Sequence, residues 1–199
     1  MKKQKNIIEA PFGETKVLLH TCCAPCSSAI IEALLKNGIT PVIYYCNPNI
    51  FPQEEYEIRK DECTRYAKAL GLEIIDADYD HDRWLEAMKG LEAEPERGGR
   101  CLKCFKLRLL RTAEYARDHG FKVITTTLAS SRWKSLDQIN EAGLWACNAV
   151  GSVPPDDSVI WWNHNWRKGG LQERRLQIIK EYDFYNQQYC GCEFSMHNK

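Results

Sequence analysis

Short apolar runs alternate along the chain with longer segments that are apolar on one side only. The runs KVLLH (16–20), PVIYY (41–45) and KVITTT (122–127) predict buried strands, and residues 73–76 and 159–162 predict two shorter ones. The segments between them have helical periodicity, and several stop at a glycine. The expected helices span residues 27–37, 53–70, 81–89, 103–119, 135–150 and 171–185.

This alternation predicts an α/β fold with a Rossmann-like parallel sheet and helices on both of its faces. In such a sheet the reactive site lies at the carboxyl ends of the strands. His20 and Cys22 leave the first strand at that edge, and residues 127–131 leave the fourth. Asn47 and Asn49 follow the second strand. We therefore expect these loops to meet in one crevice.

Length and composition favour a single cytoplasmic domain. The chain has 199 residues and a mass of 23.0 kDa, enough for a core of ordinary size. Lys and Arg together number 27, as do Asp and Glu, so any nucleic-acid surface has to be a local patch. No apolar run approaches the roughly 18 residues of a membrane helix. The start of the chain lacks the apolar stretch of a signal peptide.

Seven of the ten cysteines fall into three tight groups. They are the CCAPC group (Cys22, Cys23, Cys26), the CLKC group (Cys101, Cys104) and the CGC group (Cys190, Cys192). In a reducing cytosol, paired cysteines are more often metal ligands or redox groups than disulfides. One tetrahedral metal or one iron–sulfur cluster takes about four thiolates. Seven thiols exceed one such centre and fall short of two, which predicts a cluster with a second, reactive metal position beside it.

Other interpretations of the cysteines are open at this point. The CLKC group alone also fits half of a structural zinc site or a dithiol redox pair. Zinc knuckles usually repeat CxxC, whereas here a CC pair meets a CxC, and this favours iron–sulfur ligation. Cys63 and Cys147 are isolated and are expected to be small buried hydrophobic residues. Cys46 is also isolated but lies next to the expected crevice.

The loop after the first strand argues against one class of cofactor. Parallel sheets often carry a glycine-rich phosphate-binding loop there, but this chain has HTCCAPCSS without a glycine. We therefore expect no use of ATP.

The segment from residue 97 to residue 117 contains seven basic residues and one acidic residue, Glu114. This distribution fits either a solvated helix face or a surface that contacts phosphates. The aromatic residues between positions 161 and 189 fit either a core or a surface that stacks an extruded base. The sequence leaves both pairs of interpretations open.

Five stretches, spanning roughly residues 17–195, resemble the QueH-type epoxyqueuosine reductases. They are HTCCAPC, YCNPNIFPQEEYEIRK, RCLKCFKLRL, TTTLASS with Lys134, and KEYDFYNQQYCGCEFS. Two segments depart from the pattern that we expect of this family. Residues 161–166 match nothing in it, and Ser131-Arg132-Trp133 stands where a Ser-Pro-Tyr-like turn is expected.

The resemblance implies a HUP-type α/β fold that is one domain, 1–199, with residues 152–199 as a C-terminal extension closing over the metal site. It implies an oxidoreductase that reduces the epoxide of epoxyqueuosine in tRNA to queuosine. The implied cofactors are a [4Fe–4S] cluster and an additional mononuclear iron, without cobalamin. The implied partners are the tRNA anticodon stem-loop and an external electron donor such as flavodoxin or ferredoxin.

Carried over by position, the metal ligands are expected among the seven grouped cysteines. We expect Cys101, Cys104, Cys190 and one of the CC pair, Cys22, at the cluster, and Cys23, Cys26 and Cys192 at the reactive iron. Tyr56 and His20 are candidate proton donors. The expected substrate-binding residues are Asn47, Asn49, Glu55, Arg59, Lys60, Arg100 and Arg108.

Two other functions fit parts of the pattern. One is an iron–sulfur-dependent tRNA thiolation enzyme, which needs ATP and is disfavoured by the missing phosphate loop. The other is a non-catalytic zinc protein that binds RNA.

Overall fold

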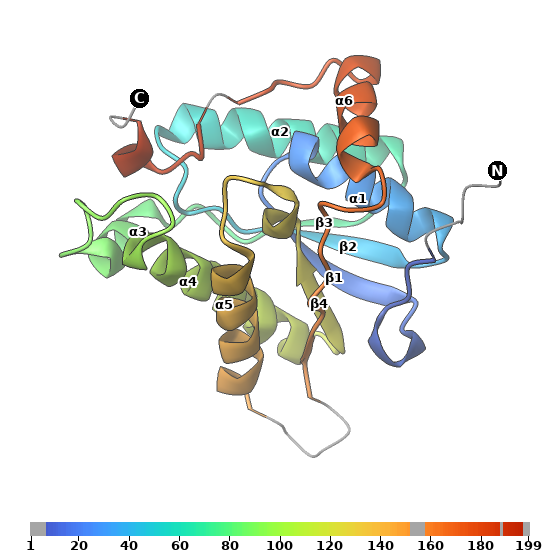
Figure 1. Ribbon diagram of the computed structural model, residues 1–199, viewed down its shortest axis with the longest axis horizontal. Helices are drawn as coiled ribbons and strands as arrows, with labels where there is room; N and C mark the ends of the chain where they lie inside the picture. The colour runs from blue at the N-terminus through green and yellow to red at the C-terminus, as the bar shows by residue number, and fades with distance from the viewer. Residues whose placement is uncertain (1–6, 152–157, 188, 197–199) are drawn as a thin grey trace.

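A computed structural model describes residues 7–151, 158–187 and 189–196. Its centre is a sheet of five parallel strands in the order β3-β2-β1-β4-β5 (Figure 1). The strands are β1 (Lys16–Thr21), β2 (Thr40–Tyr45), β3 (Ile74–Asp76), β4 (Val123–Thr126) and β5 (Ile160–Trp161). The three inner strands, β2, β1 and β4, are almost entirely buried because helices cover the sheet on both sides.

Helices cover both faces of the sheet. In Figure 1, α1, α2 and α6 lie on one face and α4 and α5 on the other, with α3 packed on α4. Their bounds are α1 (Ala24–Lys36), α2 (Gln53–Ala69), α3 (His81–Met88), α4 (Gly99–Asp118), α5 (Leu136–Ala149) and α6 (Leu171–Glu181). Among the described residues, no helix has the length and apolar character required to cross a membrane.

The order of the strands reverses at β1. From β1 the chain builds outward through β2 to β3, and it then returns to place β4 and β5 on the opposite side. His20 is paired with Tyr44 of β2 and with Thr126 of β4. The loops that leave β1 and β4 therefore diverge at their carboxyl ends, where parallel sheets open a crevice.

The α/β fold predicted from the sequence is confirmed, and each expected strand and helix is present. The largest differences lie at helix ends. The first helix begins at Ala24, before the expected Ser27, because Pro25 suits the first turn of a helix. The fourth begins at Gly99, before the expected Lys103, so the CLKC group lies inside the first two turns. The last helix ends at Glu181, before the expected Tyr185.

The C-terminal quarter of the chain joins the fold in several places. Residues 152–199 were expected as an extension over the metal site, and 152–157, 188 and 197–199 lie outside the described residues. Of the remainder, β5 joins the sheet and α6 packs on α1. Trp161, Trp162 and Trp166 are buried. These three aromatic residues therefore belong to the core and do not form a base-stacking surface.

Gly143 allows α5 to pack closely against the sheet. A Cβ atom there would lie 2.2 Å from the indole ring of Trp161. We predict that Gly143→Ala lowers the free energy of unfolding by about 1–3 kcal/mol, because the ring must move in a packed core. Chemical denaturation measures the change. Leu144→Ala is the control, since Leu144 is 54% exposed. Equal stability of the two variants would contradict this close packing.

Candidate metal centre

The three cysteine groups converge on one cavity of about 520 Å³ at the carboxyl ends of the strands. Six of the seven grouped cysteines line it: Cys22, Cys26, Cys101, Cys104, Cys190 and Cys192. Cys23 is buried beside them, with its sulfur 3.8 Å from that of Cys22. Residues separated by most of the length of the chain thus share one site.

The CCAPC group lies where β1 passes into α1. The sulfurs of Cys22, Cys23 and Cys26 all lie within 4.8 Å of one another. The Cys22 N–H donates a hydrogen bond to Thr127 Oγ1 at 3.2 Å, which ties this loop to the end of β4. Gln187 Nε2 donates to Cys23 Sγ at 2.8 Å.

Ionisation of one of these three thiols disfavours ionisation of the other two. Hydrogen bonds from Cys23 and Cys26 lower the pKa of Cys22. Burial and the neighbouring Cys22 raise the pKa of Cys23, and the hydrogen bond with Cys22 raises the pKa of Cys26 to about 12. The group therefore carries one thiolate readily, and all three thiols can ionise together only around a cation.

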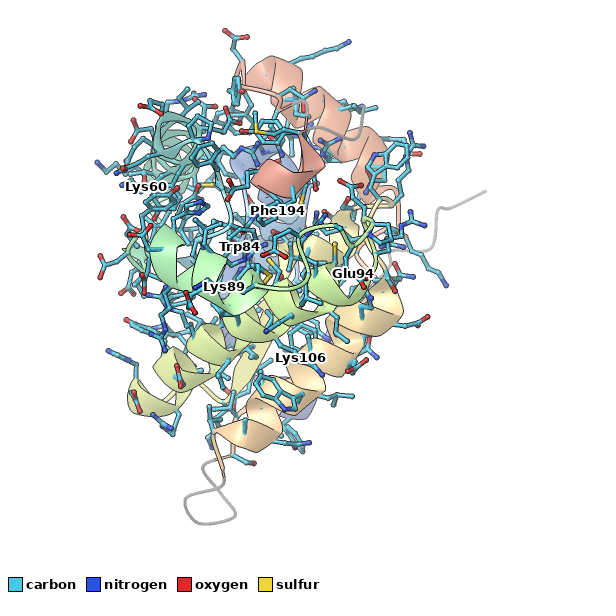
Figure 2. The ribbon with its side chains drawn as sticks, turned by 90° about the vertical axis from the view of Figure 1, so that its left-hand side faces the viewer. Lys60, Trp84, Lys89, Glu94, Lys106 and Phe194 are labelled. Carbon is cyan, nitrogen blue, oxygen red and sulfur yellow. The ribbon has the colours of Figure 1, made fainter. Side chains whose placement is uncertain are left out.

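The CLKC group lies in the first turns of α4. The indole N–H of Trp84 donates to Cys104 Sγ at 3.4 Å, and the Arg97 N–H donates to Cys101 Sγ at 3.3 Å. Trp84 packs in turn on Phe194, with ring centroids 5.9 Å apart, between α3 and the end of the chain (Figure 2). Donors from the protein thus already surround these sulfurs, as is common around metal-bound thiolates.

The CGC group approaches from the C-terminal segment, which we define as residues 189–196. Lys134 Nζ donates to Cys190 Sγ at 3.1 Å. Burial alone would raise the pKa of Cys190, but the charge and hydrogen bond of Lys134 outweigh it and lower that pKa. Burial, with the charges of Cys104 and Cys190, raises the pKa of Cys192 to about 11.

Helix α2 fixes the C-terminal segment. Arg59 is 3% exposed, and its guanidinium donates to the carbonyls of Tyr189 and Cys190 at 3.3 and 3.2 Å. Glu55 Oε1 accepts from Arg59 Nε at 2.7 Å and so holds the guanidinium in place. Gly191 has a φ of 103°, and a Cβ there would crowd Ile50 and Arg59. Arg59, on α2, therefore holds the C-terminal segment by binding the backbone of that segment.

Buried polar groups line the rest of the cavity. Arg108 is 2% exposed and donates to the Cys46 carbonyl at 3.1 Å and to Asn47 Oδ1. Arg100 donates through Nη1 to nearby carbonyls, whereas its Nε and Nη2 have no hydrogen-bond partner among the described residues. Asn49 Oδ1 is buried and likewise lacks a partner in the described part of the chain. Buried polar atoms without a partner are rare in folded proteins, and these three belong to residues that line the cavity.

Not every residue predicted for the site lies on the cavity. Arg59, Arg100, Arg108, Asn47 and Asn49 line it. Besides Cys23 and His20, three other predicted residues do not, and each is bonded to another side chain. They are Tyr56, whose hydroxyl donates to Asp76 at 2.7 Å, Lys60, which pairs with Glu57 and Asp76, and Glu55, which pairs with Arg59.

His20 is fully buried and lies beneath the cavity. Its ring nitrogens contact Thr126 Oγ1 at 2.7 Å and the Cys46 carbonyl at 3.1 Å. Burial and the charge of Arg108 lower its pKa to about 3, so the ring is neutral.

Sequence reasoning gave no role to several residues that contact the sulfurs. Lys134, Trp84 and Gln187 each donate a hydrogen bond to a grouped cysteine. Lys134 belonged to one of the matched stretches, but nothing in the local pattern distinguished it from a surface lysine. Cys46 and Cys63 are buried and Cys147 is half-buried, and none of these three lines the cavity.

The donor set fits a soft metal in thiolate coordination. Thiolates are soft ligands that favour iron–sulfur clusters and zinc, and the gathered thiols repel one another when ionised. A metal centre in their midst would neutralise that charge. Among the described residues, Cys22, Cys23 and Cys26 form the group of sulfurs close enough to meet at a single ion.

Comparison with known proteins shows the family of this chain. Residues 17–198 match the model of the family described as "Epoxyqueuosine reductase QueH". The chain belongs to the QueH family. A QueH from Haemophilus influenzae is 50% identical over 189 residues, which cover 95% of this chain and 75% of the relative. A QueH from Acinetobacter baylyi is 46% identical over 196 residues, covering 98% and 87% of the two chains.

The hold of Arg59 on the C-terminal segment can be tested in this QueH-family protein. We predict that Arg59→Ala, in metal-free protein, speeds alkylation of Cys190 and Cys192 about tenfold or more. Breaking a buried ion pair typically costs about 3–5 kcal/mol, enough to release the segment. Mass spectrometry of iodoacetamide-treated protein gives the rates.

The matched control is Lys60→Ala, since Lys60 is the next residue of α2, contacts Glu57, Asp76 and the Tyr56 ring, and does not line the cavity. Cys63, in the core, reports any global unfolding. If Cys63 reacts faster in step with Cys190, Arg59 stabilises the whole fold and not the segment.

Proposed function

We propose that this protein reduces the epoxide of epoxyqueuosine in tRNA to the cyclopentene of queuosine. Membership of the QueH family supports the reaction, since the relatives carry the name epoxyqueuosine reductase. The observation that carries the proposal is the convergence of the three cysteine groups on one cavity. Its volume, about 520 Å³, is in the range of small-molecule sites.

We further propose that the seven thiols hold a [4Fe–4S] cluster and an adjacent iron. When bound, these centres would supply electrons and a Lewis acid to the cleavage of the epoxide C–O bond. Each turnover consumes two electrons and two protons and releases water. As the family resemblance implies, the reaction would run without cobalamin. The loop after β1, which has no glycine, predicts that it does not use ATP.

The distances between the sulfurs suggest how the thiols divide. Thiolates on one tetrahedral ion, at about 2.3 Å from it, lie about 3.8 Å apart, whereas those on a cluster bind different irons and lie farther apart. Cys22 and Cys23 are 3.8 Å apart and Cys26 lies within 4.8 Å of both. We therefore propose that this trio holds the single iron and leaves it an open position.

The remaining four thiols would hold the cluster: Cys101, Cys104, Cys190 and Cys192. Besides burial, the charges of Cys190 and Cys104 raise the pKa of Cys101, and both also act on Cys192, so the four lie within electrostatic reach. This division differs from the sequence-based expectation, which placed Cys22 at the cluster and Cys192 at the iron.

The residues of the cavity bind and orient the substrate. Asn49 Oδ1 and Arg100 Nη2 are buried without partners among the described residues, so we propose that they contact polar groups of the modified base. Arg108 and Asn47 bond each other and shape the wall. Because Tyr56 and His20 do not line the cavity, we assign neither a proton-transfer role.

We propose a single cytoplasmic domain, closed at the cavity by the C-terminal segment. Its partners would be the tRNA anticodon stem-loop and a small electron-transfer protein such as flavodoxin or ferredoxin. The segment contributes Tyr189, Cys190, Cys192 and Ser195 to the lining, which supports this closure.

The reductase activity is tested with protein that is purified anaerobically and reconstituted with iron and sulfide. We predict that it converts an epoxyqueuosine-containing anticodon stem-loop to the queuosine form when dithionite is the reductant. Mass spectrometry of the digested RNA detects the loss of one oxygen atom. Absence of conversion by protein with about five irons and four sulfides per chain would contradict the proposed function.

The proposed division of the thiols predicts different metal contents for two variants. Cys192→Ala should lose most of its sulfide and visible absorption, because a cluster ligand is missing. Cys26→Ala should keep about four sulfides and lose about one iron. Iron and sulfide assays measure both.

Cys147→Ala is the control, since Cys147 lies on α5 away from the cavity. Sulfide kept in both Cys26→Ala and Cys192→Ala, with about one iron lost from each, would support the sequence-based division instead.

A further inference from the structure

The turn between the end of β4 and α5 is held by two arginines. The four successive carbonyls of residues 131–134 each accept a hydrogen bond from one of them. Arg97 donates to the carbonyls of Arg132 and Trp133, both at 2.9 Å. Arg167 Nη2 donates to the carbonyls of Ser131 and Lys134, at 2.5 and 2.7 Å. A turn whose carbonyls are satisfied in this way has little freedom to move.

Two neighbouring side chains of this turn lie in different environments. Lys134 points inward and places Nζ 3.1 Å from the sulfur of Cys190. Trp133, the preceding residue, belongs to the cavity lining yet is 67% exposed. It is the most exposed of the six tryptophans, of which four are buried. Such exposure of a large aromatic ring on a fixed turn at the mouth of a cavity is typical of a binding surface.

The charges around the ring favour an anionic partner. The guanidinium of Arg132 lies 5.1 Å from the centre of the Trp133 ring, and Arg97 lies beneath the same turn. Arg175 lines the cavity and donates to the Pro25 carbonyl at 2.9 Å. Glu96 is the acid on this lining. Aromatic rings beside arginines are the usual surface for unpaired RNA bases, since the base stacks and the arginine meets the phosphate.

Building on the proposed reductase function, we propose that Trp133 is a stacking platform for the nucleobase next to the modified nucleotide in the anticodon loop. The modified base enters the cavity, its neighbour stacks on the exposed indole, and Arg132 meets the phosphate between them. Arg97 and Arg167 already fix the turn in the free protein, so little conformational entropy is lost when RNA binds. Trp133 is thus a specificity-determining residue that selects RNA over the free nucleoside.

Kinetics with two substrates test the platform. Trp133→Ala should raise KM for the epoxyqueuosine stem-loop roughly 5- to 100-fold, the range that loss of base stacking produces. The KM for free epoxyqueuosine nucleoside should change much less, and the iron and sulfide contents should not fall. Trp133→Phe should recover most of the affinity because it keeps an aromatic ring. The matched control is Trp145→Ala, since Trp145 is 42% exposed with Lys106 over its ring but does not line the cavity.

A binding measurement separates this inference from the reductase function. An unmodified anticodon stem-loop should quench the fluorescence of the wild-type protein, and the Trp133→Phe protein should lose most of that quenching while still binding the RNA. If the protein shows this quenching but turns over no epoxyqueuosine, the proposed reductase function fails and the stacking inference stands. Full quenching in Trp133→Phe would overturn the platform.

Two kinetic outcomes would also overturn it. If Trp133→Ala lowers the iron content, or slows the stem-loop and the nucleoside equally, the residue supports the fold of the site. If it slows turnover with a protein reductant but not with dithionite, the exposed ring is a docking surface for the electron donor.

Discussion

The cost of gathering seven thiols at one buried site governs the organisation of this protein. Thiolates crowded away from water repel one another, and burial raises the pKa of Cys23 and Cys192. Arg108, which is buried, and Lys134, which is half-buried, are cations beside these sulfurs, and they favour the charged form of Cys190. Such an arrangement is stable when a metal centre completes the charge balance, which is why the donor set itself indicates metal chemistry.

The topology brings the thiols together, and side-chain bonds hold them. The reversal of strand order at β1 opens the crevice in which the CCAPC group lies, and α4 brings the CLKC group to its wall. The CGC group depends on a segment with little regular structure of its own. Arg59 therefore has a structural task, since its bonds to the Tyr189 and Cys190 carbonyls replace the hydrogen bonds that a helix or strand would provide.

Periodicity predicted the fold well because the strands are continuous apolar runs and several helices end at glycines. The cysteine groups could be found because ligand spacing is local. The sequence could not predict which groups each side chain contacts. Arg59 looks like one of several charges on an amphipathic helix, and its carbonyl partners lie about 130 residues away. Tyr56 lies in a matched stretch, but its hydroxyl turns toward Asp76 on β3. Which side of a helix meets the site depends on packing that one sequence does not record.

The turn at residues 131–134 shows how one short segment can serve two purposes. Its backbone is fixed by Arg97 and Arg167, so the inward Lys134 and the outward Trp133 keep a constant separation. Arg97 also donates its N–H to Cys101, which extends the same bonded unit to a second cysteine group. Whatever stacks on the indole is therefore positioned relative to the thiols without any intervening flexible element.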